Sequence, residues 1–209
     1  MRSARRFQKF AGRWSLTFAC ALGIGLGRSV PPAAAQSPRA DAAGTQSEWI
    51  VLGGAGSSIG GPQRGDHEQA FSAIEWGRII SGEHGPGVLR GRLEMAIELT
   101  PVFREFQSNV AQGAGFSPLM FRWNFRNYGV IDPFIEVAGG VVATNRDVPE
   151  DTTRLNFTSH AGAGARLRVS GPWSVMAGYR FHHLSNGTTA PRNPGINSNV
   201  GYLGIAYRR

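Results

Sequence analysis

The chain of 209 residues has one cysteine, Cys20. It lies within a segment that we expect to be removed on export, so the mature protein would contain no cysteine. This absence excludes a disulfide, a cysteine-ligated zinc site and a cysteine nucleophile. Thr17 stands where a lipoprotein signal usually has leucine, which argues against lipidation of Cys20.

Long hydrophobic runs are also missing. The longest apolar stretch, 14–27, has 14 residues and is too short to span a bilayer as a helix. It follows five basic residues and precedes Ala33-Ala34-Ala35, an arrangement typical of a secretory signal peptide. We therefore expect a signal peptide over 1–35, a disordered lead-in over 36–47, and a folded domain over 48–209.

The excess of positive charge belongs largely to this signal. The whole chain carries +8, but residues 1–35 hold six basic residues and no acidic one. The remainder has 16 basic and 14 acidic residues, a net charge of +2. A basic surface for nucleic acid is not indicated, and we expect no nucleic-acid partner.

Helical periodicity is absent from the mature chain, where alternation with a period of two recurs instead. In 89–99 the odd positions, such as Leu93 and Ile97, are apolar, while even positions such as Arg92 and Glu94 are charged. Similar alternation occurs in 119–126, 160–169 and 173–185. The predicted strands are 48–59, 69–80, 89–106, 116–126, 131–144, 157–169, 173–185 and 198–208.

An even number of long alternating strands predicts an all-β fold, an eight-stranded antiparallel transmembrane up-and-down β-barrel of the bacterial outer membrane. Tight connections at 127–130 and 170–172 would face the periplasm, and the longer ones at 145–156 and 186–197 would face outside. Aromatic residues near strand ends resemble an interfacial girdle.

A soluble barrel with its apolar face inward is the alternative fold. An eight-stranded barrel has little interior room, which suits the Gly and Ala on the polar face and favours the membrane barrel. The chain ends Tyr207-Arg208-Arg209, whereas outer-membrane chains commonly end on an aromatic residue.

Polar residues gather over 181–199, at the end of one predicted strand, in the following loop, and at the start of the next. His183 and Ser185 are two residues apart and share a strand face, the apolar odd one. Polar groups at membrane depth tend to be functional. The alternative is that both residues lie in the aqueous base of the loop and have no special role.

The segment resembles the active-site region of the lipid A 3-O-deacylase (PagL) family, also called acyloxyacyl hydrolase-like. The resemblance rests on His183-Leu184-Ser185-Asn186 and on Asn193-Pro194-Gly195-Ile196. The stretches 115–125 and 132–140 also resemble the middle strands of the family. The resemblance implies an outer-membrane esterase that hydrolyses a fatty-acyl ester of lipid A, without a cofactor or metal.

In that reading Ser185 is the nucleophile and His183 is its general base. Asn186, Asn193 and Gly187 are candidates for binding the oxyanion or the substrate. The acidic member of the triad in the family matches Asn197 here. An asparagine can orient His183 but cannot stabilise the imidazolium by charge.

Three functions follow from these observations: a lipid A esterase, a non-catalytic barrel that binds lipopolysaccharide or is structural, and a carrier of an internal ligand. The asparagine at 197 favours the second, the His183/Ser185 pair favours the first, and the narrow lumen disfavours the third. The oligomeric state stays open, with a homodimer as one possibility.

Overall fold

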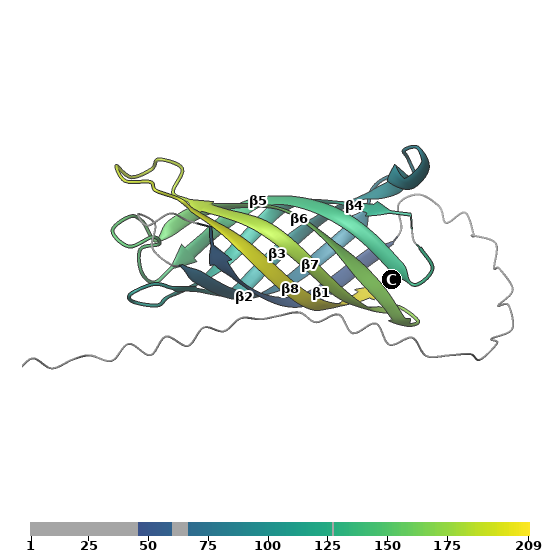
Figure 1. The fold of residues 1–209 in the computed structure, drawn as a ribbon, viewed down its shortest axis with the longest axis horizontal. Helices are drawn as coiled ribbons and strands as arrows, with labels where there is room; N and C mark the ends of the chain where they lie inside the picture. Colours follow the sequence, from purple (N-terminus) through teal and green to yellow (C-terminus); the bar gives the residue numbers. More distant parts are fainter. Residues whose placement is uncertain (1–45, 60–66, 127) are drawn as a thin grey trace, which may run out of the picture. The chain divides into compact units, whose positions relative to one another are not determined.

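The computed structural model describes residues 46–59, 67–126 and 128–209, which form a closed antiparallel barrel (Figure 1). Each strand pairs with its neighbours in sequence, and β1 pairs with β8. The strands are β1 (Ser47–Ser58), β2 (Glu68–Ile79), β3 (Gly91–Phe106), β4 (Ala111–Phe125), β5 (Ile131–Thr144), β6 (Leu155–Ser170), β7 (Trp173–Ser185) and β8 (Ile196–Arg208). The predicted signal peptide, and the predicted lead-in up to residue 45, lie outside the described residues.

All eight predicted strands are present, and the largest error is at the start of β4. This strand begins at Ala111, five residues before the predicted start. The added segment, AQGAG, consists of small residues and one glutamine, so it shows no contrast between faces. Its backbone nevertheless pairs on both sides, for example Gly113 with Phe103 and with Thr144. Hydrogen bonding to both neighbours extends a strand whose side chains carry no pattern.

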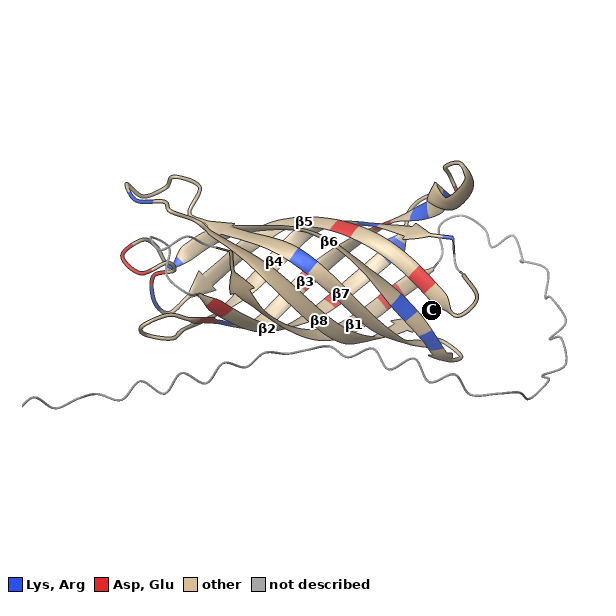
Figure 2. Cartoon of the chain, viewed as in Figure 1, with Lys and Arg blue, Asp and Glu red and all other residues tan. Residues whose placement is uncertain are grey.

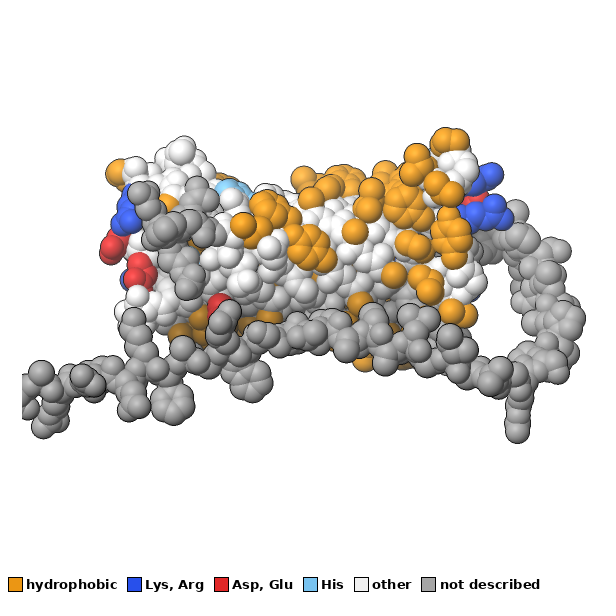
Figure 3. Space-filling model, viewed as in Figure 1, with side chains coloured by type: hydrophobic (Ala, Val, Ile, Leu, Met, Phe, Trp, Pro, Cys, Tyr) orange, Lys and Arg blue, Asp and Glu red, His pale blue; other side chains and the backbone are white. Residues whose placement is uncertain are grey.

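Apolar side chains cover the outside of the barrel, as the sequence predicts. In β3, Met95, Ile97 and Leu99 are exposed, while Glu94 and Glu98 are buried. The same odd face points outward in β6, β7 and β8. On the side seen in Figure 3, apolar side chains, together with backbone and uncharged polar side chains, cover most of the wall, and most of the charged side chains lie near the two ends.

Buried ion pairs occupy the centre of the lumen. Figure 2 shows charged residues along the middle of the strands, and the residues that form these pairs are buried. Arg122 contacts Glu75, Glu94 and Glu136 at 2.6, 3.1 and 2.9 Å. Arg180 contacts Glu75, Glu98 and Glu136, each at 2.7 Å. Two buried apolar clusters accompany the ion pairs, one around Phe134 and Met176 and one around Phe103 and Leu184. The soluble alternative requires the apolar strand face inward, whereas here that face points outward and the charged face points inward.

Tyr202 completes this network by donating its hydroxyl to Glu136 at 2.9 Å. The Tyr202 ring lies against Gly178, where an added Cβ would come within 2.3 Å of the ring. A glycine on the inner face of β7 is thus required by the packing of an aromatic ring in a narrow lumen.

We predict that Arg180→Leu strongly destabilises the barrel. The substitution leaves three buried carboxylates without one of their cationic partners, and breaking a buried pair typically costs about 3–5 kcal/mol. The free energy of unfolding in urea, measured in detergent micelles, tests this. Arg90→Leu is the matched control, because the pair of Arg90 with Glu83 is half exposed and should contribute under about 1 kcal/mol. Equal losses from both variants would contradict a structural role for the lumenal network.

Aromatic residues mark one end of the barrel wall. Trp49 and Trp173 flank Tyr207 in register across three neighbouring strands, and the rings of Trp173 and Tyr207 meet edge to face with centroids 4.9 Å apart. Both tryptophans are about half exposed. This row is the kind of aromatic belt that lies at a membrane–water interface. No helix in the described ranges is long and apolar enough to cross a membrane.

The connections follow the predicted length pattern only in part. Those at 126–130 and 171–172 are tight, and those at 145–154 and 186–195 are long, as expected. The β3–β4 connection has only the four residues 107–110, because β4 starts early. The β2–β3 connection, 80–90, is longer than the β4–β5 and β6–β7 connections at the same end of the barrel. It contains a short 3-10 helix, Gly87–Leu89. His183, Ser185 and Asn197 lie beside the long β7–β8 connection. This is the end of the barrel opposite the aromatic row.

Candidate active site

His183 and Asn197 lie opposite each other in the register of β7 and β8. Both occupy the outward face and are half-buried. The Nδ1 atom of His183 is 2.6 Å from Oδ1 of Asn197. The pairing that the sequence predicted between these two residues is thus a direct hydrogen bond in the structure.

This contact determines where the histidine carries its proton. An amide oxygen can only accept a hydrogen bond, so Nδ1 of His183 must be the donor. In the neutral ring Nε2 is then unprotonated and can act as a base. The asparagine therefore holds the tautomer that a general base requires.

Ser185 lies two residues beyond His183 on the same face of β7 and is also half-buried. Within the described residues, its hydroxyl makes no hydrogen bond to His183. Hydrogen bonds between a nucleophile and its base are often loose without substrate and tighten in the complex. The structure brings Ser185 and His183 to the same end of β7, close to Gly195.

Gly195 lies beside the side chains of both His183 and Ser185. It is buried with φ +63°, and a Cβ built there would lie 3.2 Å from Cε1 of His183 and 3.8 Å from Cβ of Ser185. The ring edge that includes Cε1 thus faces the same small space as Ser185. Sequence reasoning gave Gly195 no role, although the Asn-Pro-Gly-Ile motif that contains it was the available signal.

Asn186 and Asn193 hold the β7–β8 loop together. The backbone N–H of Asn186 donates to Oδ1 of Asn193 at 3.1 Å, and the Asn186 side chain donates to the carbonyl of Arg192 at 2.8 Å. Oδ1 of Asn186 accepts from the N–H of Thr188 at 3.0 Å. The side chain of Asn186 is almost completely buried, so these bonds fix the loop rather than face outward.

Two donors remain beside the site. Asn193 is exposed, and its amide nitrogen has no hydrogen-bond partner among the described residues. The backbone N–H of Gly187 also has no hydrogen-bond partner among the described residues. Gly187 has φ +60° and lies against the ring of Phe157. Phe157 is in turn the register partner of Ser185. These two N–H groups are the predicted oxyanion donors that stay available in this arrangement.

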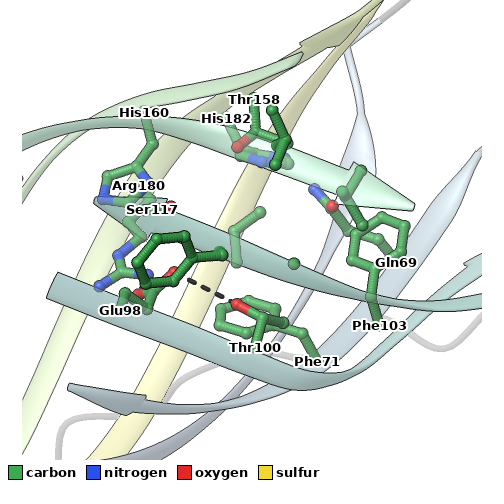
Figure 4. Close-up of a pocket in the computed structure, with 15 residues that line it drawn as sticks. Gln69, Phe71, Glu98, Thr100, Phe103, Ser117, Thr158, His160, Arg180 and His182 are labelled. Atoms are coloured by element: carbon green, nitrogen blue, oxygen red, sulfur yellow. Dashed lines mark hydrogen bonds and ion pairs between the residues drawn. The ribbon is translucent and has the colours of Figure 1, made fainter. Parts of the chain in front are cut away.

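A cavity of about 40 Å³ lies on the other face of the same strands, inside the lumen (Figure 4). His160 and His182 line it from β6 and β7, and Glu98 and Thr100 line it from β3. The β7 strand separates this cavity from His183 and Ser185, which point outward. In the described ranges no cluster of His, Cys, Asp and Glu could hold a metal ion.

The fold is similar to solved outer-membrane barrels. The crystal structure of the outer membrane enzyme PagL matches with a TM-score of 0.59 and 22% identity, over 74% of this chain and 97% of that one. Neisserial surface protein A (NspA) matches with a TM-score of 0.52 and 13% identity, over 77% of this chain and 95% of that one. These likenesses establish an eight-stranded outer-membrane barrel.

The sequence comparison goes beyond the fold. No match was found among curated proteins. The family described as "Lipid A 3-O-deacylase (PagL)" matches residues 83–206, which is more than half of the chain and includes the whole region of His183, Ser185 and Asn197. The chain belongs to the lipid A 3-O-deacylase (PagL) family.

Proposed function

We propose that this protein hydrolyses the 3-O-linked fatty-acyl ester of lipid A in the outer leaflet of the outer membrane, with Ser185 as nucleophile and His183 as base. The observation that carries the proposal is the hydrogen bond from His183 to Asn197, which leaves Nε2 of the ring free to take a proton. Family membership supplies the substrate and the position of the ester.

The site lies at a depth that suits an ester in the outer leaflet. Trp173 and His183 are ten residues apart on β7. With a strand rise of about 3.4 Å per residue and a tilt near 40°, they are separated by about 25 Å along the membrane normal. The apolar band of such barrels is also about 25 Å tall. If Trp173 marks the periplasmic interface, His183 and Ser185 lie at the outer one.

The reaction proceeds in two steps. Ser185 Oγ attacks the ester carbonyl as Nε2 of His183 takes its proton, and the bond from the carbonyl carbon to the sugar oxygen then breaks. His183 returns the proton to the departing sugar hydroxyl, which leaves an acyl group on Ser185. Water, deprotonated by His183, then attacks this acyl-enzyme, and the fatty acid departs as Ser185 regains its proton.

The tetrahedral intermediate of each step carries a negative oxygen that needs aimed donors. The amide nitrogen of Asn193 and the N–H of Gly187 are our candidates, since both are unengaged within the described residues. Each such donor is typically worth about 3 kcal/mol in the transition state. Asn186 supports them indirectly, because its own side chain closes the loop that carries both groups.

The direct test is an assay of the purified protein in detergent micelles with lipid A, with mass spectrometry of the released fatty acid. We expect one 3-O-linked chain to be released per lipid A and the product to lack that chain alone. Release from a different position would assign a different regiospecificity to the same site.

A second function, lipopolysaccharide binding without catalysis, is favoured by one observation: within the described ranges no carboxylate contacts His183, whose ring is held by a neutral amide. Lipid A that binds to the folded protein but is recovered intact after prolonged incubation would support this second function.

A further inference from the structure

The chain leaves β7 through a tight turn over 186–189. The carbonyl of Asn186 accepts a hydrogen bond from the N–H of Thr189 at 3.1 Å, and φ is positive at both central residues, +60° at Gly187 and +64° at Thr188. This is the conformation of a type I′ turn, in which glycine, asparagine and aspartate are usual. A β-branched threonine with positive φ is strained, and such strain persists only where neighbouring groups impose it.

Two side chains hold this turn from different sides. Oδ1 of the buried Asn186 accepts a hydrogen bond from the N–H of Thr188 at 3.0 Å. The ring of Phe157 lies against Gly187, where an added Cβ would come 2.9 Å from Cδ2 and 3.0 Å from Cε2 of the ring. This close approach requires that residue 187 has no side chain. The strained turn is therefore held between a buried amide and an aromatic ring.

The position of Phe157 is not explained by contact with lipid alone. Phe157 faces outward and is half exposed, as is expected of an apolar residue of the wall, and Phe181 is similar in both respects. Phe157, however, is the register partner of Ser185, and Gly187 is two residues beyond Ser185. One ring therefore lies beside the proposed nucleophile and against the residue whose N–H is a candidate oxyanion donor.

We infer that Phe157 is a positioning residue, which keeps the turn over 186–189 in place so that the N–H of Gly187 points toward the oxyanion formed at Ser185. This inference rests on the proposed function, because it takes Ser185 as the nucleophile and Gly187 as an oxyanion donor. A donor contributes most when it is aimed in advance, since it then needs no reorganisation during the reaction. Without the ring, the strained turn can relax and the N–H loses its direction.

Phe157→Leu tests the inference, because leucine suits a lipid-facing wall but offers no flat ring to Gly187. Loss of one oxyanion donor costs about 10²–10³ in kcat, so a donor that is present but poorly aimed should cost about tenfold or more. We expect this loss in kcat for lipid A, with KM changed by less than about threefold, because only the transition state carries the oxyanion. Phe157→Tyr, which keeps the ring, should restore most of the rate.

Phe181→Leu is the matched control. It is the same change on the outward face of the neighbouring strand, at a phenylalanine of comparable exposure, and it should keep the kcat of the wild-type protein. Equal losses of kcat in Phe157→Leu and Phe181→Leu would show a general effect of the aromatic wall and would contradict a specific role of Phe157.

A double-mutant cycle asks whether Phe157 acts through Gly187. Gly187→Ala places a methyl group in the space of the ring, at an unfavourable φ, so it should itself displace the N–H. Adding Phe157→Leu to Gly187→Ala should then cost little more, because the aim of the donor is already lost. Losses that multiply in the double variant would show that Phe157 acts by another route and would overturn the inference.

The inference can fail while the proposed function holds. Wild-type kcat in Phe157→Leu, alongside an inactive Ser185→Ala, would be that outcome. Labelling by a fluorophosphonate covers a protein that releases no fatty acid: Ser185 Oγ attacks phosphorus, fluoride departs, His183 takes the proton, and the phosphoryl oxygen occupies the place of the oxyanion. Slower labelling of Phe157→Leu than of Phe181→Leu would support the inference, and equal rates would overturn it. A wild-type protein that is neither labelled nor hydrolytic would overturn both proposals.

Discussion

Ser185→Ala is expected to lower the rate of lipid A deacylation by about 10³-fold or more, and His183→Ala by a similar factor. Residues that act as a nucleophile–base unit show such losses singly, and removing both costs little more than removing one. The double variant should therefore be nearly as active as each single variant. Initial rates of fatty-acid release in micelles, with equal amounts of folded protein, measure these losses.

Folding can be separated from catalysis in these variants. Both side chains lie at the outer end of β7, half-buried, and neither belongs to the lumenal network, so the urea unfolding of both variants should match that of the wild-type protein. A variant that unfolds normally and is inactive has lost chemistry alone.

Ser159 provides a demanding control. It lies on the outward face of β6, is exposed, and is the register partner of His183 on the side away from Asn197. It is thus the second hydroxyl beside the same histidine. Ser159→Ala should keep activity within a few-fold of the wild-type protein, because the ring edge of His183 that includes Cε1 faces Gly195 and Ser185. The opposite result, an inactive Ser159→Ala with an active Ser185→Ala, would move the nucleophile to β6.

The fold could be predicted because period-two alternation directly encodes the two faces of a barrel wall. Ile97 and Glu98 differ in character because Ile97 faces outward, whereas Glu98 faces the lumen and pairs there with Arg180. The prediction failed where side chains are small, at the start of β4, because glycine and alanine are compatible with both faces. The β3–β4 connection is shorter than the predicted strand bounds imply for the same reason, since a connection is defined only by where its strands end.

The residues of the candidate site and the contact of His183 with Asn197 could be predicted from the sequence, but the hydrogen bonds of the β7–β8 loop could not. The spacing of His183 and Ser185 fixes a common face, and the antiparallel hairpin places Asn197 beside them. The bonds of Asn186 depend on how the ten-residue loop closes, and the sequence does not encode that closure in any short pattern.

Asn197 determines how fast the proposed chemistry can be. In the serine protease triad, replacing the aspartate by asparagine costs about 10⁴ in turnover, largely because the asparagine imposes the wrong tautomer on the histidine. Here the amide oxygen faces Nδ1, so the correct tautomer is retained. What is missing is the negative charge that would stabilise the imidazolium formed as His183 takes the proton.

Asn197→Asp should therefore raise the turnover of lipid A by about tenfold. Aspartate has nearly the same shape, so it can keep the 2.6 Å contact with Nδ1, while hydrogen bonds to charged groups exceed neutral ones by about 1–1.5 kcal/mol. Each 1.4 kcal/mol corresponds to a factor of ten in rate.

Asn197→Glu carries the same charge on a longer side chain, which must bend to reach Nδ1, so we expect a smaller gain than with aspartate. Asn197→Ala should lower the rate, because it removes the group that holds the ring and its tautomer. All three rates are measured as kcat at saturating lipid A. Three variants with wild-type turnover, alongside an inactive Ser185→Ala, would show that some other residue orients His183 and that position 197 has no part in the reaction.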